Sequence, residues 1–187
     1  MFEDCGLPLE RKFCRMGDQM ELGADATIEG YASLFGKRDH GGDVVQPGAY
    51  AASLAVLSER GISVKLLWQH DPSQPIGVWD EVREDAHGLF VKGRLLTETA
   101  KGREAAVLIE AGAIDGLSIG YRTVKAERDA GGQRLLAELE LWEVSLVTFP
   151  MLSQARVGAK AEASLSHMSQ DLSEVFRNLR RNLAIGL

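Results

Sequence analysis

The chain has 187 residues, which is enough for one domain with a substantial hydrophobic core, or for one domain and a tail. Hydrophobic residues make up 45% of the sequence and charged residues 26%, a composition that excludes wholesale disorder. The formal net charge of −6 disfavours a nucleic-acid binder, which needs a concentrated basic face, and no apolar run approaches the roughly 18 residues of a membrane span.

The predicted elements begin with an N-terminal arm, residues 1–24, which carries no clear hydrophobic period. Its acidic start, Met1–Asp4, differs from the basic and then apolar start of a secretory signal, so we expect a soluble protein that stays in the compartment where it is made. Both cysteines, Cys5 and Cys14, lie in this arm. Two ligands without a neighbouring histidine cannot close a structural zinc site, so reduced thiols and no bound metal are expected.

Residues 25–157 are predicted to form a mainly β domain. Strand-like alternation of apolar and polar residues predicts strands at 27–35, 62–70, 76–83, 88–96, 114–125 and 134–149. About six or seven strands with inserted helices indicate an α+β fold, either a small closed or partly open β-barrel or a sandwich.

Two helices are predicted among these strands. One runs through residues 49–57, where Pro47 can start it and Gly61 ends it. The other covers residues 100–111, with a cap at Thr97 or Glu98 and Gly112 as its stop. The predicted connections are a long loop at 36–48 and turns at 71–73, 84–86 and 129–132.

The C-terminal part, residues 158–187, is predicted to be a linker followed by an amphipathic helix. Apolar residues recur there at steps of three and four, and they are Leu165, Met168, Leu172, Val175, Leu179 and Leu183. Two placements of this helix stay open, because its apolar stripe can bury either against its own barrel or against another chain.

His70 is the first of three polar residues that interrupt predicted strand faces. Alternation places it at the end of a buried row with Val64, Leu66 and Trp68, directly before the predicted turn at 71–73. The structural interpretation is a hydrogen-bonded core histidine, and the functional one is an acid–base residue.

Ser118 shares its predicted strand face with Gly116 and Gly120, so no side chain crowds its hydroxyl and a peptide carbonyl could approach it. Residues 116–120 match the pattern G-x-S-x-G formally. The strand–turn–helix context of a nucleophile elbow is not visible around them, which weakens the α/β-hydrolase interpretation. The structural alternative is a strand made flexible by glycine.

Glu143 is predicted to point among apolar side chains of its strand. Its expected companions on that face are Leu139, Leu141, Val147 and Phe149. A buried carboxylate costs several kcal/mol unless it is paired or hydrogen-bonded, and a protonated imidazole is the obvious partner. Glu143, His70 and Ser118 would then supply an orienter, a base and a nucleophile.

The loop around Asp39, His40 and Asp43 is a further candidate, as a rim that binds substrate or metal. The alternative is a solvated loop, because nothing else in the sequence completes a ligand set. The four histidines of the chain form no HxH or HxxxH pair, which disfavours a metal hydrolase.

Several segments together resemble the tailed-phage prohead (capsid maturation) protease family, which shares its fold with the herpesvirus assemblins. The segments are 28–32, 42–50, 67–72 with 75–77, 116–121 and 141–150. They follow the family's order between about residues 26 and 157. The resemblance implies an assemblin-like serine endopeptidase on a small β-barrel, with His70 as base and Ser118 as nucleophile. Assemblins use a second histidine after the serine, whereas Glu143 stands at the comparable place here.

The resemblance also implies a biological role. Proteases of this family are packed inside the immature capsid, or prohead, in the cytoplasm of the host bacterium. There they cleave the scaffolding segment of the major capsid protein and themselves. The chain would come from a phage, a prophage or a gene transfer agent, would form a homo-oligomer or act as a monomer, and would need no cofactor, nucleic acid or membrane.

Two other functions stay open. One is a catalytically inactive scaffold or capsid-assembly component that kept the same barrel. Labelling by a serine-reactive phosphonate would favour the enzyme over this alternative. The other is an esterase of the nucleophile-elbow type, which would cleave small esters but not capsid protein.

Overall fold

The computed structural model describes residues 10–14 and 26–149 of the chain, and these contain one eight-stranded β-sheet and two helices. The strands are β1 (Glu10–Cys14), β2 (Thr27–Leu34), β3 (Asp43–Val45), β4 (Lys65–Trp68), β5 (Asp71–Glu84), β6 (Gly88–Leu95), β7 (Gly116–Arg128) and β8 (Arg134–Val147). The helices are α1 (Ala51–Arg60) and α2 (Ala100–Glu110). The predicted linker and amphipathic helix, residues 158–187, lie outside the described residues.

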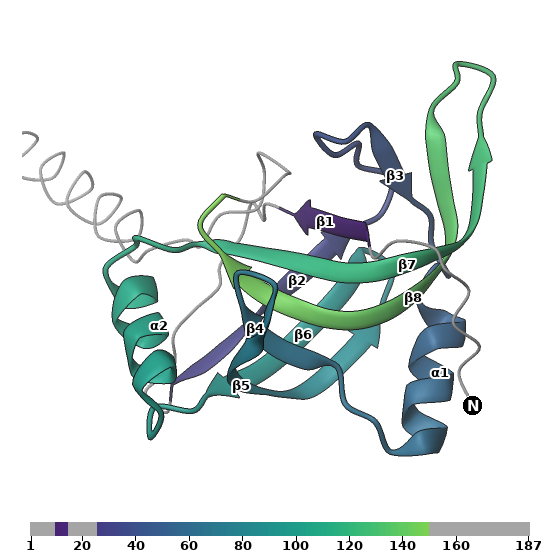
Figure 1. Cartoon of the computed structure of the whole chain (residues 1–187). Helices are drawn as coiled ribbons and strands as arrows, with labels where there is room; N and C mark the ends of the chain where they lie inside the picture. Colours follow the sequence, from purple (N-terminus) through teal and green to yellow (C-terminus); the bar gives the residue numbers. More distant parts are fainter. Residues whose placement is uncertain (1–9, 15–25, 150–187) are drawn as a thin grey trace, which may run out of the picture. The chain divides into compact units, whose positions relative to one another are not determined.

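The strands follow the order β1-β7-β8-β4-β5-β6-β2, and β3 pairs with β8 beside this path. The pairings of β8 with β3 and β4 are parallel, and the remaining ladders are antiparallel. The sheet curls strongly, with α1 and α2 at opposite ends of it (Figure 1). The curl brings β1 and β2, the two ends of the strand order, into contact. This confirms the predicted mainly β fold with a partly open barrel and two inserted helices.

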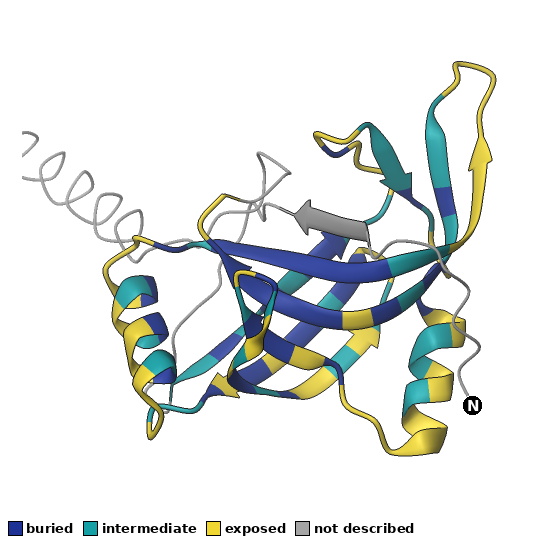
Figure 2. Ribbon diagram, viewed as in Figure 1, coloured by how far each residue is buried: buried dark blue, intermediate teal, exposed yellow. Residues whose placement is uncertain are grey.

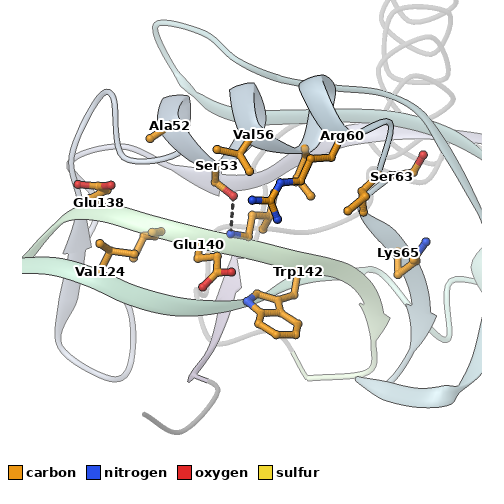
Figure 3. A pocket seen from close by; sticks show the side chains of 14 residues that line it. Ala52, Ser53, Val56, Arg60, Ser63, Lys65, Val124, Glu138, Glu140 and Trp142 are labelled. Carbon is orange, nitrogen blue, oxygen red and sulfur yellow. Dashed lines mark hydrogen bonds between the residues drawn. The ribbon is translucent and has the colours of Figure 1, made fainter. Parts of the chain in front are cut away.

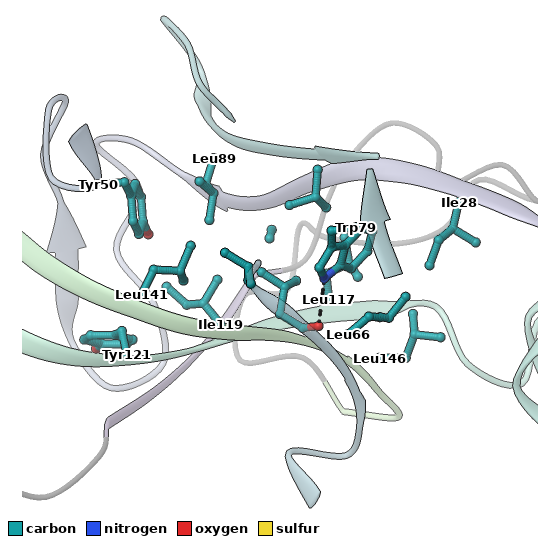
Figure 4. Close-up of a cluster of buried hydrophobic side chains, with 14 of the residues drawn as sticks. Ile28, Tyr50, Leu66, Trp79, Leu89, Leu117, Ile119, Tyr121, Leu141 and Leu146 are labelled. Atoms are coloured by element: carbon teal, nitrogen blue, oxygen red, sulfur yellow. Dashed lines mark hydrogen bonds between the residues drawn. The ribbon is translucent and has the colours of Figure 1, made fainter. Parts of the chain in front are cut away.

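The hydrophobic core lies inside the curl and draws on β2–β8 and on α2. The start of β7 (residues 116–121) and the end of β8 (residues 143–147) are buried, whereas the tip of their hairpin is exposed (Figure 2). Figure 4 shows Trp79 of β5 reaching across this core, where its indole Nε1–H donates a hydrogen bond of 3.2 Å to the carbonyl oxygen of Val144. A buried indole needs such a partner, and this bond ties β5 to the part of β8 that carries Glu143.

Both helices form where the sequence predicts them. Gly61 adopts φ +64° after α1 and satisfies the C-terminal carbonyls there, as a left-handed C-cap does. The Glu84 carboxylate of β5 accepts hydrogen bonds from the N–H groups of Gly48 and Tyr50, which precede α1. The cap of α2 is Thr99, whose hydroxyl accepts the N–H of Gly102 at 3.0 Å, and not Thr97 or Glu98 as predicted.

Three segments differ in structure from what the sequence predicts. Residues 43–45 of the predicted loop form β3, because this edge of β8 leaves backbone groups to pair with. The turn predicted at 71–73 lies at residues 69–70 instead. Within the predicted N-terminal arm, residues 10–14 form β1, which pairs with β7 so that Phe13 lies opposite Ser118.

Candidate active site

His70 occupies a two-residue turn that connects β4 and β5. Trp68 pairs with Asp71, and both residues between them adopt the left-handed conformation, with φ +53° at Gln69 and +62° at His70. Such hairpin turns favour asparagine and glycine, so a Gln-His pair here is strained by about 1–3 kcal/mol per residue. The turn also ends the strand alternation. His70 therefore does not extend the predicted row with Leu66, and its ring lies against Glu143 instead.

Hydrogen bonds to residues 145–148, at and just beyond the end of β8, hold the strained turn. The Gln69 N–H donates to the Leu146 carbonyl at 2.9 Å, and the Gln69 side-chain amide donates to the Thr148 hydroxyl at 2.7 Å. The N–H of His70 donates to the Ser145 hydroxyl at 3.2 Å. These contacts fix a backbone that the sequence alone would not favour, a pattern that accompanies functional sites.

Glu143 reaches His70 because β8 contains a bulge. Gly120 of β7 lies opposite Glu143, but the next residue, Tyr121, lies opposite Leu141, so Trp142 is the extra residue. The bulge places Glu143 on the face away from the hydrophobic core, whereas Leu141 faces the core. The prediction that Glu143 shares a face with Leu139 and Leu141 is therefore wrong, because it assumed unbroken alternation.

The carboxylate of Glu143 is buried and both of its oxygens have partners. Oε1 lies 2.5 Å from Nδ1 of His70, and the side chains are only 9% and 4% exposed. Oε2 accepts a hydrogen bond from the Ser145 hydroxyl. A carboxylate at Nδ1 holds the proton on that nitrogen, which makes Nε2 the basic atom of the ring. The pair thus has the chemistry of a base and its orienter.

Ser118 lies on β7, directly opposite Ser145 of β8, and both side chains are fully buried. Side chains opposite each other on antiparallel strands point to the same face, with Cβ atoms about 5 Å apart. Their neighbours Ile119 and Val144 face the core, so Ser118, Ser145 and Glu143 share the other face. The pairing of β7 with β8 thereby places Ser118 on the same face of the sheet as Glu143.

Ser145 is the site residue that sequence reasoning missed. It contacts both His70 and Glu143, yet its small side chain gave no distinctive pattern. Ser145 lies two residues after Glu143, so strand alternation predicts that the two side chains share a face. This spacing was the sequence feature that could have identified Ser145. Its position opposite Ser118 depends on the register of β7 and β8, which the sequence does not reveal.

The loop around Asp39, His40 and Asp43 does not form a metal-ligand cluster. The Asp39 carboxylate accepts the N–H of Asp43 at 2.8 Å, and the Asp43 carboxylate pairs with the Arg134 guanidinium at 2.8 Å. Over residues 10–14 and 26–149, no group of three His, Cys, Asp or Glu side chains is arranged to hold a metal ion. The Asp39 carboxylate thus caps the Asp43 backbone, and the Asp43 carboxylate ties this segment to β8.

A groove of about 470 Å³ lies between α1 and the β7–β8 strands and is mainly apolar (Figure 3). Val56 of α1 and Trp142 of β8 both line it, and each is 41% exposed. His70, Ser118 and Glu143 do not line it. The groove is therefore distinct from the polar cluster, although Trp142 directly precedes Glu143. In the part of the chain that is described, no helix is long and apolar enough to span a membrane.

Two phage proteins match this chain in sequence. The prohead protease of Enterobacteria phage HK97 is 29% identical over 171 residues, which cover 88% of this chain and 75% of that protein. The capsid polyprotein of Pseudomonas phage PAJU2 is 32% identical over 114 residues, which cover 54% of this chain and 17% of the polyprotein.

One solved structure shares the fold. The bacteriophage T4 capsid assembly protease superposes with a TM-score of 0.61 at 15% identity, over 76% of this chain and 98% of that one. A varicella-zoster virus protease matches with a TM-score of 0.39 at 14% identity, over 67% of this chain and 59% of that one. The family described as caudovirus prohead serine protease matches residues 16–171, which include His70, Ser118 and Glu143. The chain therefore belongs to the caudovirus prohead serine protease family.

Proposed function

We propose that this prohead protease is a serine endopeptidase in which Ser118 is the nucleophile, His70 the general base and Glu143 the orienter of the imidazole. The observation that carries the proposal is the 2.5 Å contact between His70 Nδ1 and Glu143 Oε1 on the strand face that also carries Ser118. A buried imidazole paired with a carboxylate, beside a serine, is the arrangement by which a weak hydroxyl nucleophile is activated.

The reaction is an acyl transfer in two halves. His70 Nε2 accepts the proton of the Ser118 hydroxyl while Ser118 Oγ attacks the peptide carbonyl carbon. The imidazolium then gives this proton to the departing amine as the C–N bond breaks, which leaves an acyl-enzyme. In the second half, Nε2 takes a proton from water as the water oxygen attacks the acyl carbon. The bond between this carbon and Ser118 Oγ then breaks, the imidazolium returns the proton to Oγ, and the new carboxylic acid departs. Glu143 stays ionised throughout and stabilises each imidazolium.

Access to Ser118 sets a condition on this mechanism. The Ser118 side chain has 0% exposure, and β1 covers the edge of β7 beside it, where Phe13 lies opposite Ser118. A peptide carbonyl can therefore reach Ser118 only after the groups around it move. The proposal thus requires a movement that opens the site before substrate binds.

The proposed substrate is the scaffolding segment of the major capsid protein, together with the protease itself. The support comes from the relatives, since a phage prohead protease and a phage capsid polyprotein both match this chain. The proposed place of action is the interior of the prohead in the host bacterium. A homo-oligomer is proposed as the working form there.

The test is co-expression of the major capsid protein with the wild-type chain, with Ser118→Ala and with Ser33→Ala, followed by intact-mass measurement. Ser33 is the matched control because it is equally buried and its hydroxyl makes no hydrogen bond. We expect shortened capsid protein with wild type and Ser33→Ala, and full-length protein with Ser118→Ala. Normal processing by Ser118→Ala would refute the assignment. Full-length capsid protein in every arm would favour an inactive scaffold component, or an esterase if small esters are still cleaved.

A further inference from the structure

Ser145 is a buried side chain that the proposed acyl transfer leaves without a role. It lies on β8, two residues beyond Glu143, and has 0% exposure. A hydroxyl taken out of water requires hydrogen-bond partners, and its choice of partners shows what it stabilises. The Ser145 hydroxyl has two such hydrogen-bond partners, and both belong to the candidate site.

The first partner is the backbone of His70. The His70 N–H donates to Ser145 Oγ at 3.2 Å, at a residue held in the left-handed conformation with φ +62°. A turn of non-glycine residues in this conformation persists only where neighbouring groups hold it. Ser145 is one of these groups, and it acts directly on the residue that carries the imidazole.

The second partner is the carboxylate of Glu143. Ser145 Oγ donates its proton to Oε2, which leaves Oε1 directed at Nδ1 of His70. One hydroxyl therefore accepts from the backbone of the base and donates to the carboxylate of the orienter. This links the position of the imidazole to the position of the carboxylate through a single atom.

We propose that Ser145 is a positioning residue of the protease, whose hydroxyl fixes His70 and Glu143 relative to each other. This inference rests on the proposed function for its kinetic consequences, but its structural consequence is independent of activity. Loss of the hydroxyl frees the turn and the carboxylate to move apart. A displacement of about 1 Å in such a pair costs on the order of 10²-fold in rate.

The kinetic test compares Ser145→Ala, Ser145→Thr and Ser53→Ala in the full-length chain acting on capsid protein. Ser53 of α1 is the matched control, because its hydroxyl also accepts a backbone N–H, that of Leu141 at 2.9 Å, but contacts neither His70 nor Glu143. We expect Ser145→Ala to lower kcat by about 10- to 100-fold with little change in KM. Ser145→Thr keeps the hydroxyl and is expected to recover most of kcat. Equal kcat in Ser145→Ala and wild type would overturn the proposal.

A spectroscopic test needs no activity. In ¹⁵N-labelled Ser118→Ala chain, the Nδ1 proton of His70 is expected as a far-downfield resonance, because it lies in a short hydrogen bond to a carboxylate. Adding Ser145→Ala should shift or abolish this resonance, whereas adding Ser53→Ala should not. An unchanged resonance in the Ser145→Ala background would overturn the proposal even if Ser118→Ala is inactive. A changed resonance would support it even if Ser118 proves not to be the nucleophile.

Discussion

Gly120 of β7 lies directly opposite Glu143 of β8, and the space that a side chain at Gly120 would fill is occupied by the Glu143 carboxylate. A Cβ atom at Gly120 would lie 2.1 Å from Glu143 Oε1 and 2.8 Å from the carboxyl carbon. Real Cβ atoms do not approach other atoms so closely. The sequence suggested that Gly120 leaves space around Ser118. In the structure, this space is needed by the Glu143 carboxylate.

Gly120→Ala is predicted to lower proteolytic activity by about 10²-fold while the fold is retained, because the added methyl group displaces the carboxylate from His70. The measurement is the rate of capsid-protein processing, with thermal unfolding followed in parallel. Gly131→Ala in the exposed β7–β8 hairpin is the control and should leave the rate unchanged. Full activity in Gly120→Ala would show that the carboxylate position observed here does not matter.

Glu143→Gln is predicted to lower kcat by about 10²- to 10⁴-fold. The amide keeps the shape of the side chain but removes the negative charge that stabilises the imidazolium, and its NH₂ group can favour the wrong tautomer of His70. Glu138→Gln, a glutamate on the same strand outside the His70–Glu143 pair, should keep normal kcat. Equal effects of the two substitutions would argue against an orienting role for Glu143.

Asp85 gives the fold a predictable pH dependence. Partial burial raises the pKa of its carboxyl, but hydrogen bonds from the His87 and Gly88 N–H groups, the Tyr31 hydroxyl and the Arg83 guanidinium outweigh this effect and lower the pKa to about 2. The folded-state pKa is therefore below the unfolded value of about 3.9. The stabilisation is fully present above the unfolded pKa and is lost as the pH falls from about 4 to 2.

Asp85→Asn is accordingly predicted to lower Tm at pH 7 by a few degrees, with a difference from wild type that shrinks towards pH 2. The measurement is thermal unfolding across this pH range. Asp80→Asn is the control, because Asp80 forms a half-exposed ion pair with Arg94 that contributes little to stability. A difference in Tm that stays constant from pH 7 to pH 2 would contradict the linkage.

The sequence was sufficient to predict three residues of the candidate site, His70, Ser118 and Glu143, but neither Ser145 nor the way in which they meet. Alternation predicted the strands well, and it failed at two local deviations. The left-handed pair Gln69–His70 lacks the Asn-Gly signature of such turns, and the bulge at Trp142 carries no marker of its own. Both deviations turn a side chain toward the site.

Other features depend on contacts between distant segments. The three residues of β3 are too few to form a recognisable strand pattern, and they become a strand because β8 pairs with them. The place of Ser145 beside His70 depends likewise on the parallel register of β4 and β8, in which Leu67 lies opposite Ser145. Contacts between distant segments determine both the β3 strand and the position of Ser145, so local sequence propensity could not predict them.

The central claim is that Ser118 and His70 act as one catalytic unit, and a double-mutant comparison tests it most directly. The initial rate of capsid-protein processing is measured for wild type, Ser118→Ala, His70→Ala and the double variant. Each single substitution is predicted to remove several orders of magnitude of rate, on the order of 10⁴-fold or more, and the double variant to be no slower than the single ones. Rate losses that multiply in the double variant, or near-normal processing by either single variant, would contradict the account.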